Sequence, residues 1–299
     1  MTYIAPAIPA AAPVVRRPSA VMTFCRQQPL GAVSFVVIFV MMFAGLLPQF
    51  VAPYDPLDID FAQILGAPSW EHWFGTDAFG RDIFSRIIWG SRTALVIGFA
   101  SSFIGSAIGA VLGIASAYFG GRTDNWIQRF VDVLLAFPII VLALVVVAAL
   151  RKTIVYGVDV NLIIAIAIPI VPRVARVVRA AALSVNVMPY IDAARAAGYS
   201  DSRIIFRHMA PNVVAPFLIM FTAFIAQAIL LEASLSFLGL GVTEPTAAWG
   251  LMLSGNAADF YREAPWMVIF PGVAISLAVF AFNLFGDSLR DFLDPRFKV

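Results

Sequence analysis

Six long runs of apolar residues limit what this chain of 299 residues can fold into. They cover residues 31–50, 93–119, 131–150, 161–178, 213–231 and 266–285. A helix needs about 20 apolar residues to cross the hydrocarbon core of a bilayer, because each residue adds about 1.5 Å. The mean hydropathy of +0.89 is also more than a soluble core of this size can hide. The sequence therefore predicts an all-α integral membrane protein with six transmembrane helices.

The distribution of Lys and Arg predicts the orientation of these helices. An even number of spans places both termini on one side, and cytoplasmic loops carry an excess of basic residues. With both termini inside, fourteen of the 20 Lys and Arg residues are cytoplasmic. We therefore expect a multi-pass membrane protein with cytoplasmic N- and C-termini.

This topology divides the chain into segments. Residues 29–50 form the first transmembrane helix, and residues 93–290 form a five-helix core whose longest inner loop is 180–212. The other segments are a flexible cytoplasmic tail at 1–28, a periplasmic segment at 51–92 and a cytoplasmic C-terminal tail at 291–299.

Several kinds of chemistry are absent from the sequence. A net charge of +2 without a clustered basic face excludes a nucleic-acid partner. Neither lysine, Lys152 or Lys298, follows a glycine, so a phosphate-binding loop is missing. His72 and His208 fall on opposite sides of the membrane and cannot share a metal or a catalytic triad; we expect His72 to be solvated or at an interface. Cys25 is alone. We expect no catalytic residue, metal site or cofactor in this chain.

Two polar side chains in the fifth span are candidates for lining a translocation path. Gln227 is the only strongly polar residue well inside that span, although packing against a neighbouring helix is the competing interpretation. Glu232 lies near its outer end, where we expect interfacial water to lower the cost of ionisation. In the second span, Gly105, Gly109 and Gly113 form a small-residue face that favours close helix packing, within this chain or with a partner.

The inner loop begins with three arginines on one helical face. Arg173, Arg176 and Arg179 recur every three residues. We expect them to extend toward lipid phosphates.

Two short helices follow in the same loop. Residues 188–198 favour a helix ended by Gly198, and residues 201–209 a second helix capped by Ser200 and closed by Pro211. Helices this short are marginal alone in water. The pair either docks into a groove on a soluble partner or lies on lipid headgroups.

This loop resembles a motif of a known family. Its residues follow the E-A-A-x-x-x-G loop of permease subunits in bacterial ABC importers, with Asp192 in place of the usual Glu and Ala210 in place of the usual Leu. The matching positions are Asp192, Ala193, Ala194, Gly198, Ile205 and Pro211.

Further motifs resemble the dipeptide, oligopeptide and nickel branch of that family. They are the runs at 75–77, 80–82 and 85–86, at 119–122 with Asp132 and 137–138, at 232–241, at 249–250, and at 282–296. Together they cover residues 28–296 in the expected order.

The resemblance implies a type I ABC importer permease core, formed by residues 93–290, with cytoplasmic coupling helices, in the bacterial inner (plasma) membrane. This subunit would form half of the translocation pathway for peptides or a related small solute. Its partners would be two ATP-binding subunits, a homologous permease subunit, a periplasmic or lipid-anchored solute-binding protein and membrane lipid, with ATP bound by the partner subunits. The ATPase-coupling residues would be Asp192, Ala193, Ala194, Arg195, Gly198, Tyr199, Ile205, Phe206 and Pro211.

Two other functions are possible for such a chain. An ATP-independent channel or secondary transporter would need strongly polar residues at mid-membrane depth, and the spans offer little beyond Gln227. An intramembrane protease would need a pair of aspartates, or a serine and a histidine, at matched depth, and the spans lack both.

Overall fold

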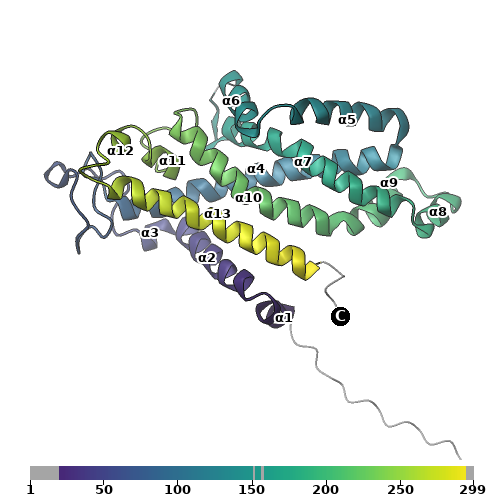
Figure 1. Ribbon diagram of the computed structural model, residues 1–299, viewed down its shortest axis with the longest axis horizontal. Coiled ribbons are helices and arrows are strands. Elements are labelled where there is room, and N and C mark those ends of the chain that lie inside the picture. The colour runs from purple at the N-terminus through teal and green to yellow at the C-terminus, as the bar shows by residue number, and fades with distance from the viewer. Residues whose placement is uncertain (1–19, 151, 156–157, 294–299) are drawn as a thin grey trace, which may run out of the picture.

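Long helices packed side by side form the body of the protein (Figure 1). The computed structural model describes residues 20–150, 152–155 and 158–293. Within this part of the chain, five helices are long and apolar enough to cross a membrane by themselves. They are α2 (Pro29–Leu46), α4 (Ile83–Phe119), α7 (Val160–Asn186), α10 (Val214–Phe237) and α13 (Trp266–Leu293). Five of the six predicted spans are thus continuous helices.

The third predicted span is broken. Instead of one helix over 131–150, the chain forms α5 (Gly121–Leu135) and α6 (Ile139–Ala149), which are bent by 94° relative to each other. Pro138 lies at the break, where it lacks an N–H and disfavours a helical conformation for Phe137. The third predicted span is therefore not one continuous helix, and the pair counts as at most one crossing.

Helix α4 begins well before the predicted span at residue 93. Asp82 caps it by accepting a hydrogen bond from the Ser85 backbone N–H (2.7 Å). Arg86 and Arg92 lie in its first turns, and these charges hide the start of the helix from a count of apolar residues.

Shorter elements join the long helices. The chain also forms α1 (Ala20–Gln27), α3 (Pro48–Val51), the 3₁₀ helix η1 (Phe61–Gln63), α8 (Pro189–Ala196), α9 (Asp201–Ile204), the π-helical η2 (Ile205–Met209), the 3₁₀ helix η3 (Ala210–Val213), α11 (Trp249–Met252) and α12 (Asn256–Asp259). Strands β1 (Ile154–Val155) and β2 (Val158–Asp159) pair antiparallel, with Ile154 opposite Asp159.

Helix α1 lies inside the predicted flexible tail 1–28. The Phe24 ring packs edge-on against the ring of Phe292 in α13, with centroids 5.4 Å apart, and this contact holds the helix against the bundle. Residues 1–19 and 294–299, which include the rest of that tail and most of the predicted C-terminal tail, lie outside the described residues.

The most extensive helix packing joins α4 to α7. A Cβ atom at Gly105, Gly109 or Gly113 would lie 2.6–2.7 Å from a carbonyl oxygen of α7, such as that of Val171 beside Gly109. Real Cβ atoms do not approach so closely, so only glycine fits at these three positions. The small-residue face is thus used within this chain.

Candidate functional site

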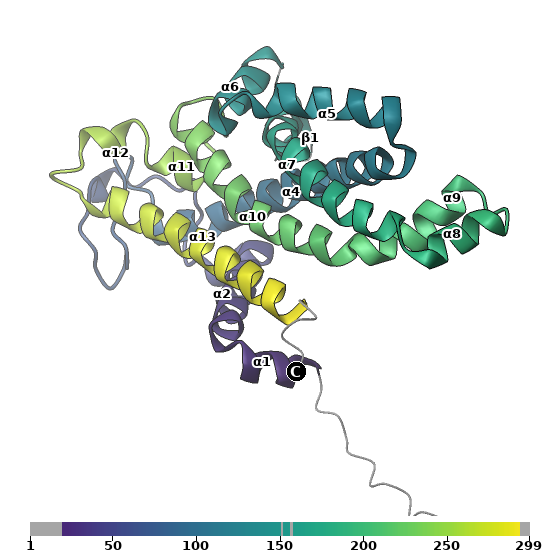
Figure 2. The same cartoon turned by 45° about the vertical axis from the view of Figure 1, so that its right-hand side comes forward.

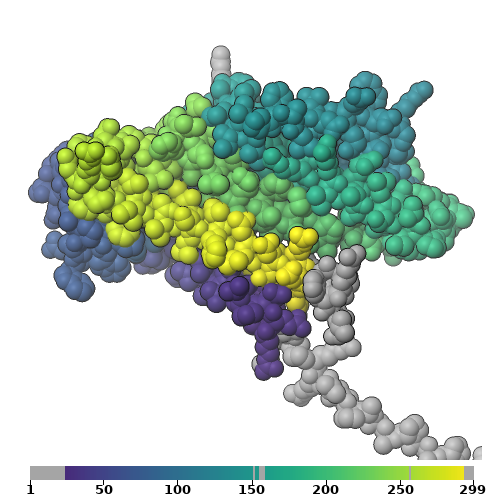
Figure 3. Space-filling model, in the orientation of Figure 1, coloured from purple at the N-terminus to yellow at the C-terminus, as the bar shows by residue number. Residues whose placement is uncertain are grey.

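The α8–α9 hairpin (residues 188–209) projects from one end of the molecule (Figures 1 and 2). The space-filling view shows it standing clear of the body (Figure 3). The segment before α4, together with α11 and α12, lies at the opposite end (Figure 1). The two ends are described in turn.

Gly198 ends α8 as predicted. Its φ of +74° is a left-handed conformation that side chains with a Cβ rarely adopt. The Gly198 N–H donates to the Arg195 carbonyl (2.9 Å) and the Tyr199 N–H to the Ala194 carbonyl (3.1 Å). This pair of bonds is the Schellman motif, which satisfies carbonyls at the end of a helix. Ser200 precedes α9, but its side chain makes no capping hydrogen bond, so that expectation is wrong.

Pro211 does not close the second helix. The chain continues from α9 through η2 and η3 into α10, so that 37 residues from Asp201 to Phe237 form one span. Proline leaves a carbonyl of the preceding turn without its usual N–H donor. Here the Asn212 side-chain amide donates to the His208 carbonyl (2.7 Å). The π-helical turn η2 is wider than an α-helical turn and leaves room for the pyrrolidine ring of Pro211. The hairpin is therefore continuous with a spanning helix.

Arg195 ties the hairpin to two long helices. Its guanidinium donates to Asn186 Oδ1 at the end of α7 (2.6 Å) and to Asp192 Oδ1 (3.1 Å). It also lies 5.5 Å from the ring centroid of Tyr118 in α4, whose hydroxyl donates to Asp201 Oδ1 (2.6 Å). Helices too short to be stable alone are in this way fixed to the bundle.

A second cluster joins the two arms of the hairpin. The Tyr199 ring stacks with the His208 ring at a centroid distance of 6.0 Å, and the Arg203 guanidinium lies 3.9 Å from the centroid of Tyr199. Such a cation over an aromatic face is attractive. The sequence analysis missed His208 and Arg203 as partners, although their spacing from Tyr199 was visible.

The predicted coupling residues divide into two groups. Ala194 is 6% exposed and Ile205 is half-buried, and both pack against the chain's own core. Phe206 is 73% exposed, an unusual position for a large apolar side chain. The exposed group comprises Asp192, Ala193, Arg195, Gly198, Tyr199, Phe206 and Pro211.

The arginines of α7 contact protein where we expected lipid. Both oxygens of Asp124 accept hydrogen bonds from Arg179 (2.7 and 2.6 Å), and Asp132 pairs with Arg176. Since Asp124 and Asp132 belong to α5, these pairs bind α5 to α7. The expectation that Arg176 and Arg179 extend to lipid phosphates is wrong, because the broken third span supplies carboxylates beside them.

The two polar candidates of α10 lie in different surroundings. Gln227 is half-buried on the same helix face as the exposed Ala223 and Leu230. Glu232 is 0% exposed, and its Oε1 accepts a hydrogen bond from Ser236 Oγ (2.7 Å). Our expectation of interfacial water at Glu232 is wrong. That either residue lines a path stays a prediction, for which Gln227 is the better placed.

Four charged residues clamp the end of the bundle opposite the hairpin, which the predicted topology places outside the cytoplasm and which we therefore call the outer end. Arg81 binds Asp77 (2.7 Å) and Glu244 (2.9 Å), and Arg86 lies 3.5 Å from Glu244 and donates to the Pro56 carbonyl (3.0 Å). Burial disfavours the charged form of Arg81, but the hydrogen bonds and charges of Glu244 and Asp77 outweigh it and raise its pKa. This outer clamp (Asp77, Arg81, Arg86 and Glu244) joins the segment before α4 to the loop after α10.

His72 belongs to the same end of the molecule and is not solvated. Its side chain is 12% exposed, and Nδ1 lies 3.0 Å from Oδ1 of Asp82, the residue that caps α4. The expectation of a solvated histidine is wrong, since Asp82 and the ring of Tyr54, with its centroid 4.8 Å away, enclose it; its position at an interface with a partner stays a prediction.

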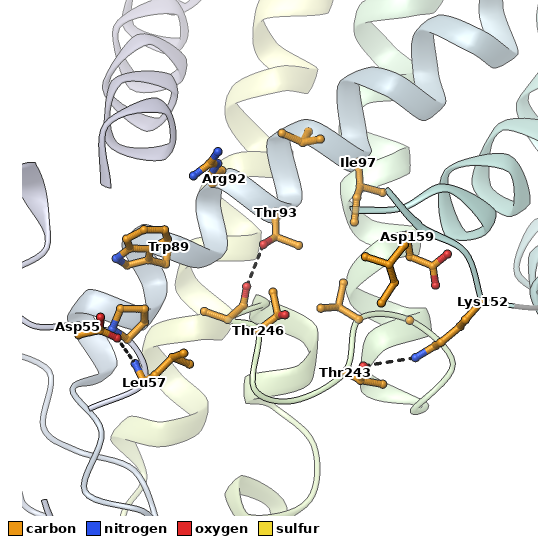
Figure 4. A pocket seen from close by; sticks show the side chains of 16 residues that line it. Asp55, Leu57, Trp89, Arg92, Thr93, Ile97, Lys152, Asp159, Thr243 and Thr246 are labelled. Carbon is orange, nitrogen blue, oxygen red and sulfur yellow. Dashed lines mark hydrogen bonds between the residues drawn. The ribbon is translucent and has the colours of Figure 1, made fainter. Parts of the chain in front are cut away.

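A pocket of about 460 Å³ opens near the outer clamp (Figure 4). One face of α4 forms a wall, and the loop after α10 closes over it through a hydrogen bond from Thr93 Oγ1 to the Ala247 carbonyl (2.9 Å). Neither Gln227 nor Glu232 lines it. The sequence did not predict this outer pocket, because its wall combines residues of the predicted segment 51–92, Trp89 and Arg92, with the start of the predicted span at residue 93, and it is completed by loops that only folding brings together.

Comparison with known proteins gives consistent matches. A family model described as "Binding-protein-dependent transport system inner membrane component" matches residues 105–299. A protein of Brucella suis biovar 1 named as a peptide transport system permease is 41% identical over 267 residues, which cover 89% of this chain and 88% of the relative. The glutathione transport system permease protein GsiD of Escherichia coli O6:K15:H31 is 42% identical over 274 residues, covering 91% and 88%.

One solved structure resembles the fold. A chain of the MetNI methionine ABC transporter, in an inward-facing conformation, superimposes with a TM-score of 0.54 at 18% sequence identity. The match covers 71% of this chain and 98% of that chain.

Proposed function

Because the chain belongs to the family of inner membrane components of binding-protein-dependent transport systems, we propose that its α8–α9 hairpin is the contact through which ATPase subunits drive it. The chain is a permease component of an ABC importer. Such a component works with ATPase and solute-binding partners. We propose that the partners of this chain are two ATP-binding subunits, one homologous permease subunit and a periplasmic or lipid-anchored solute-binding protein.

The substrate that we propose is a peptide or a related small solute. The support is the naming of relatives that are 41–42% identical over most of the chain, one for peptide and one for glutathione transport. The chain would form half of the translocation pathway, with Gln227 on the exposed face of α10 as a lining residue.

The observation that carries the coupling role is the combination of exposure and anchoring in the hairpin. Phe206 and Asp192 face outward, while Arg195 fixes the same hairpin to α7 and α4. A surface that is apolar, exposed and firmly attached to three spanning helices suits a partner that transmits movement. ATP would be bound and hydrolysed by the partner subunits, and this chain would need no cofactor.

The orientation is tested by thiol labelling. Replacing Cys25 by serine removes the only native cysteine, after which Ser200→Cys reports on the hairpin and Ala67→Cys on the outer segment. A membrane-impermeant maleimide should label Ala67→Cys in intact spheroplasts and Ser200→Cys only after permeabilisation. Labelling of Ser200→Cys from outside would overturn the proposed cytoplasmic hairpin and termini.

The coupling role is tested by Phe206→Ala, with Phe61→Ala, 74% exposed at the outer end, as matched control. Replacing a large side chain at the centre of a protein–protein interface by alanine commonly costs about 2 kcal/mol or more of binding free energy. We expect co-purification of the ATPase subunits and ATP-driven uptake of labelled peptide to fall about tenfold or more for Phe206→Ala only. ATP-independent uptake by the chain alone would instead support a channel or secondary transporter.

A further inference from the structure

One face of α4 is turned toward the outer pocket over two turns. Trp89, Arg92, Thr93, Val96 and Ile97 follow the spacing i, i+3, i+4, i+7, i+8, which places them on one side of the helix. Figure 4 shows these side chains lining the hollow together with residues of the loop after α10. The wall therefore presents an aromatic ring and a cation, Trp89 and Arg92, near the start of α4, and aliphatic side chains one to two turns further along the helix.

The two cations at this pocket lack carboxylate partners. In the described part of the chain, Arg92 makes no ion pair, and Lys152 Nζ makes only a long contact of 3.4 Å with Thr243 Oγ1. This differs from the outer clamp, where Arg81 and Arg86 both reach carboxylates. A guanidinium and an ammonium beside an open pocket are free to bind an anionic group from outside.

The two carboxylates of the pocket are partly occupied by local structure. Asp55 Oδ1 accepts a hydrogen bond from the Leu57 N–H (2.8 Å), and Asp159 Oδ1 caps α7 through the Asn161 N–H (3.0 Å). Each carboxylate keeps its charge and its second oxygen but is held in place by its own loop or helix end, whereas the two cations have no carboxylate partner in the described part of the chain and have threonine hydroxyls beside them. The natural ligand of the two cations is a carboxylate.

We propose that the outer pocket is a binding site for small amphiphilic carboxylates. Arg92 and Lys152 would be the counter-ions, and Trp89 and Ile97 of the α4 wall, with Val242 of the loop after α10, would contact the apolar part of the ligand. A volume of about 460 Å³ lies within the range of small-molecule sites. The permease would then contact the charged end of the solute itself. The inference rests on the proposed function only in placing this pocket on the solute's route.

The test measures binding to the purified full chain in a neutral maltoside detergent, without ATP or partner subunits. The probes are N-acetyl-dialanine and its C-terminal amide, which differ only in the carboxylate, and saturation-transfer NMR detects weak binding of either. We expect the acid to bind about tenfold or more tightly than the amide, as charge-assisted hydrogen bonds imply. Equal binding of acid and amide would overturn the proposal.

Variants locate the binding. Arg92→Gln and Lys152→Gln should each weaken binding of the acid about tenfold, while Arg262→Gln, an exposed arginine that does not line the pocket, should leave it unchanged. Thr246→Trp fills the pocket without removing a charge and should also abolish binding. Undiminished binding in Arg92→Gln or Thr246→Trp would refute the site, as would displacement of the acid by phosphatidylglycerol, which would assign the cations to lipid headgroups.

The two proposals fail separately. Loss of ATP-driven uptake in the assembled complex with intact binding of the acid would contradict only the coupling role. Uptake that proceeds normally while the purified chain fails to distinguish acid from amide would contradict only the pocket.

Discussion

Individual residues at both ends of the bundle fix segments that are distant in the sequence. Gly198 does so by its backbone, since a φ of +74° turns the chain between α8 and α9. Apart from its two chain neighbours, no residue in the described part of the chain has an atom within 4 Å of the position a Cβ would take there. A substitution at Gly198 therefore tests conformational strain without steric overlap.

We predict that Gly198→Val impairs coupling and Gly198→Asn largely preserves it. A left-handed conformation costs about 1–2 kcal/mol for a residue with a Cβ and is worst for a β-branched one, whereas asparagine tolerates it. The measurement is ATP-driven uptake in reconstituted vesicles containing all subunits. Uptake at the wild-type rate with valine, or equal loss with both variants, would contradict this role of the turn.

The conformation at Gly198 could be predicted from sequence because it depends on one residue type. The partners of Arg176, Arg179 and His72 could not, because each is a carboxylate brought near by folding. Glu232 was misjudged for a related reason: its depth along the helix was visible, but the helices that enclose it were not.

At the scale of elements, the contact between α4 and α7 is the most extensive in the bundle. Glycines every four residues allow the two backbones to approach until a Cβ would touch a carbonyl oxygen. Gly272 in α13 offers the matched opposite case, because a Cβ there meets no atom within 4 Å.

We predict that Gly109→Ala destabilises the protein by about 1–3 kcal/mol, the usual cost of overpacking. Gly272→Ala should be neutral or stabilising by up to about 1 kcal/mol, since alanine is the better helix former. The midpoint of thermal unfolding in detergent measures both. A drop of the same size in the two variants would show that the α4–α7 contact is not the cause.

The long helices could be predicted because apolar length alone marks them. Their ends and breaks could not, since these depend on caps and partners. Asp82 starts α4 ahead of its apolar run, Pro138 breaks the third span where α5 pairs with α7, and Asn212 lets a helix pass Pro211. The outer pocket escaped prediction because its wall crosses the unrecognised start of α4 and its other lining residues come from distant loops.

At the scale of the whole molecule, the outer clamp joins residues 163 positions apart in the chain. Arg86 is 1% exposed and Arg81 10%, so both depend on the charges they meet. Glu244 is half exposed, so water weakens its interaction with the two arginines and reduces its contribution to stability. Glu263, an exposed glutamate outside the clamp, offers a control for removing a carboxylate.

We predict that Glu244→Ala lowers the free energy of unfolding by about 1–3 kcal/mol, the cost of leaving a buried charged donor with fewer acceptors. Glu263→Ala should change it by less than about 0.5 kcal/mol. Limited proteolysis of the segment at 52–82 would report local opening, which we expect to be faster for Glu244→Ala only. Identical digestion of both variants would mean that the clamp does not hold this segment.

The unbroken helix from Asp201 to Phe237 spans roughly 55 Å at 1.5 Å per residue. Its first turn is part of the hairpin, and its last turn leads into the loop that covers the outer pocket. Thermodynamic linkage between two sites is reciprocal. If binding of the ATPase subunits at the hairpin changes the affinity of the pocket for its solute by some factor, then a bound solute must change the affinity of the hairpin for the ATPase subunits by the same factor. A transporter with an empty pocket and one with a filled pocket would therefore differ at the opposite end of this helix.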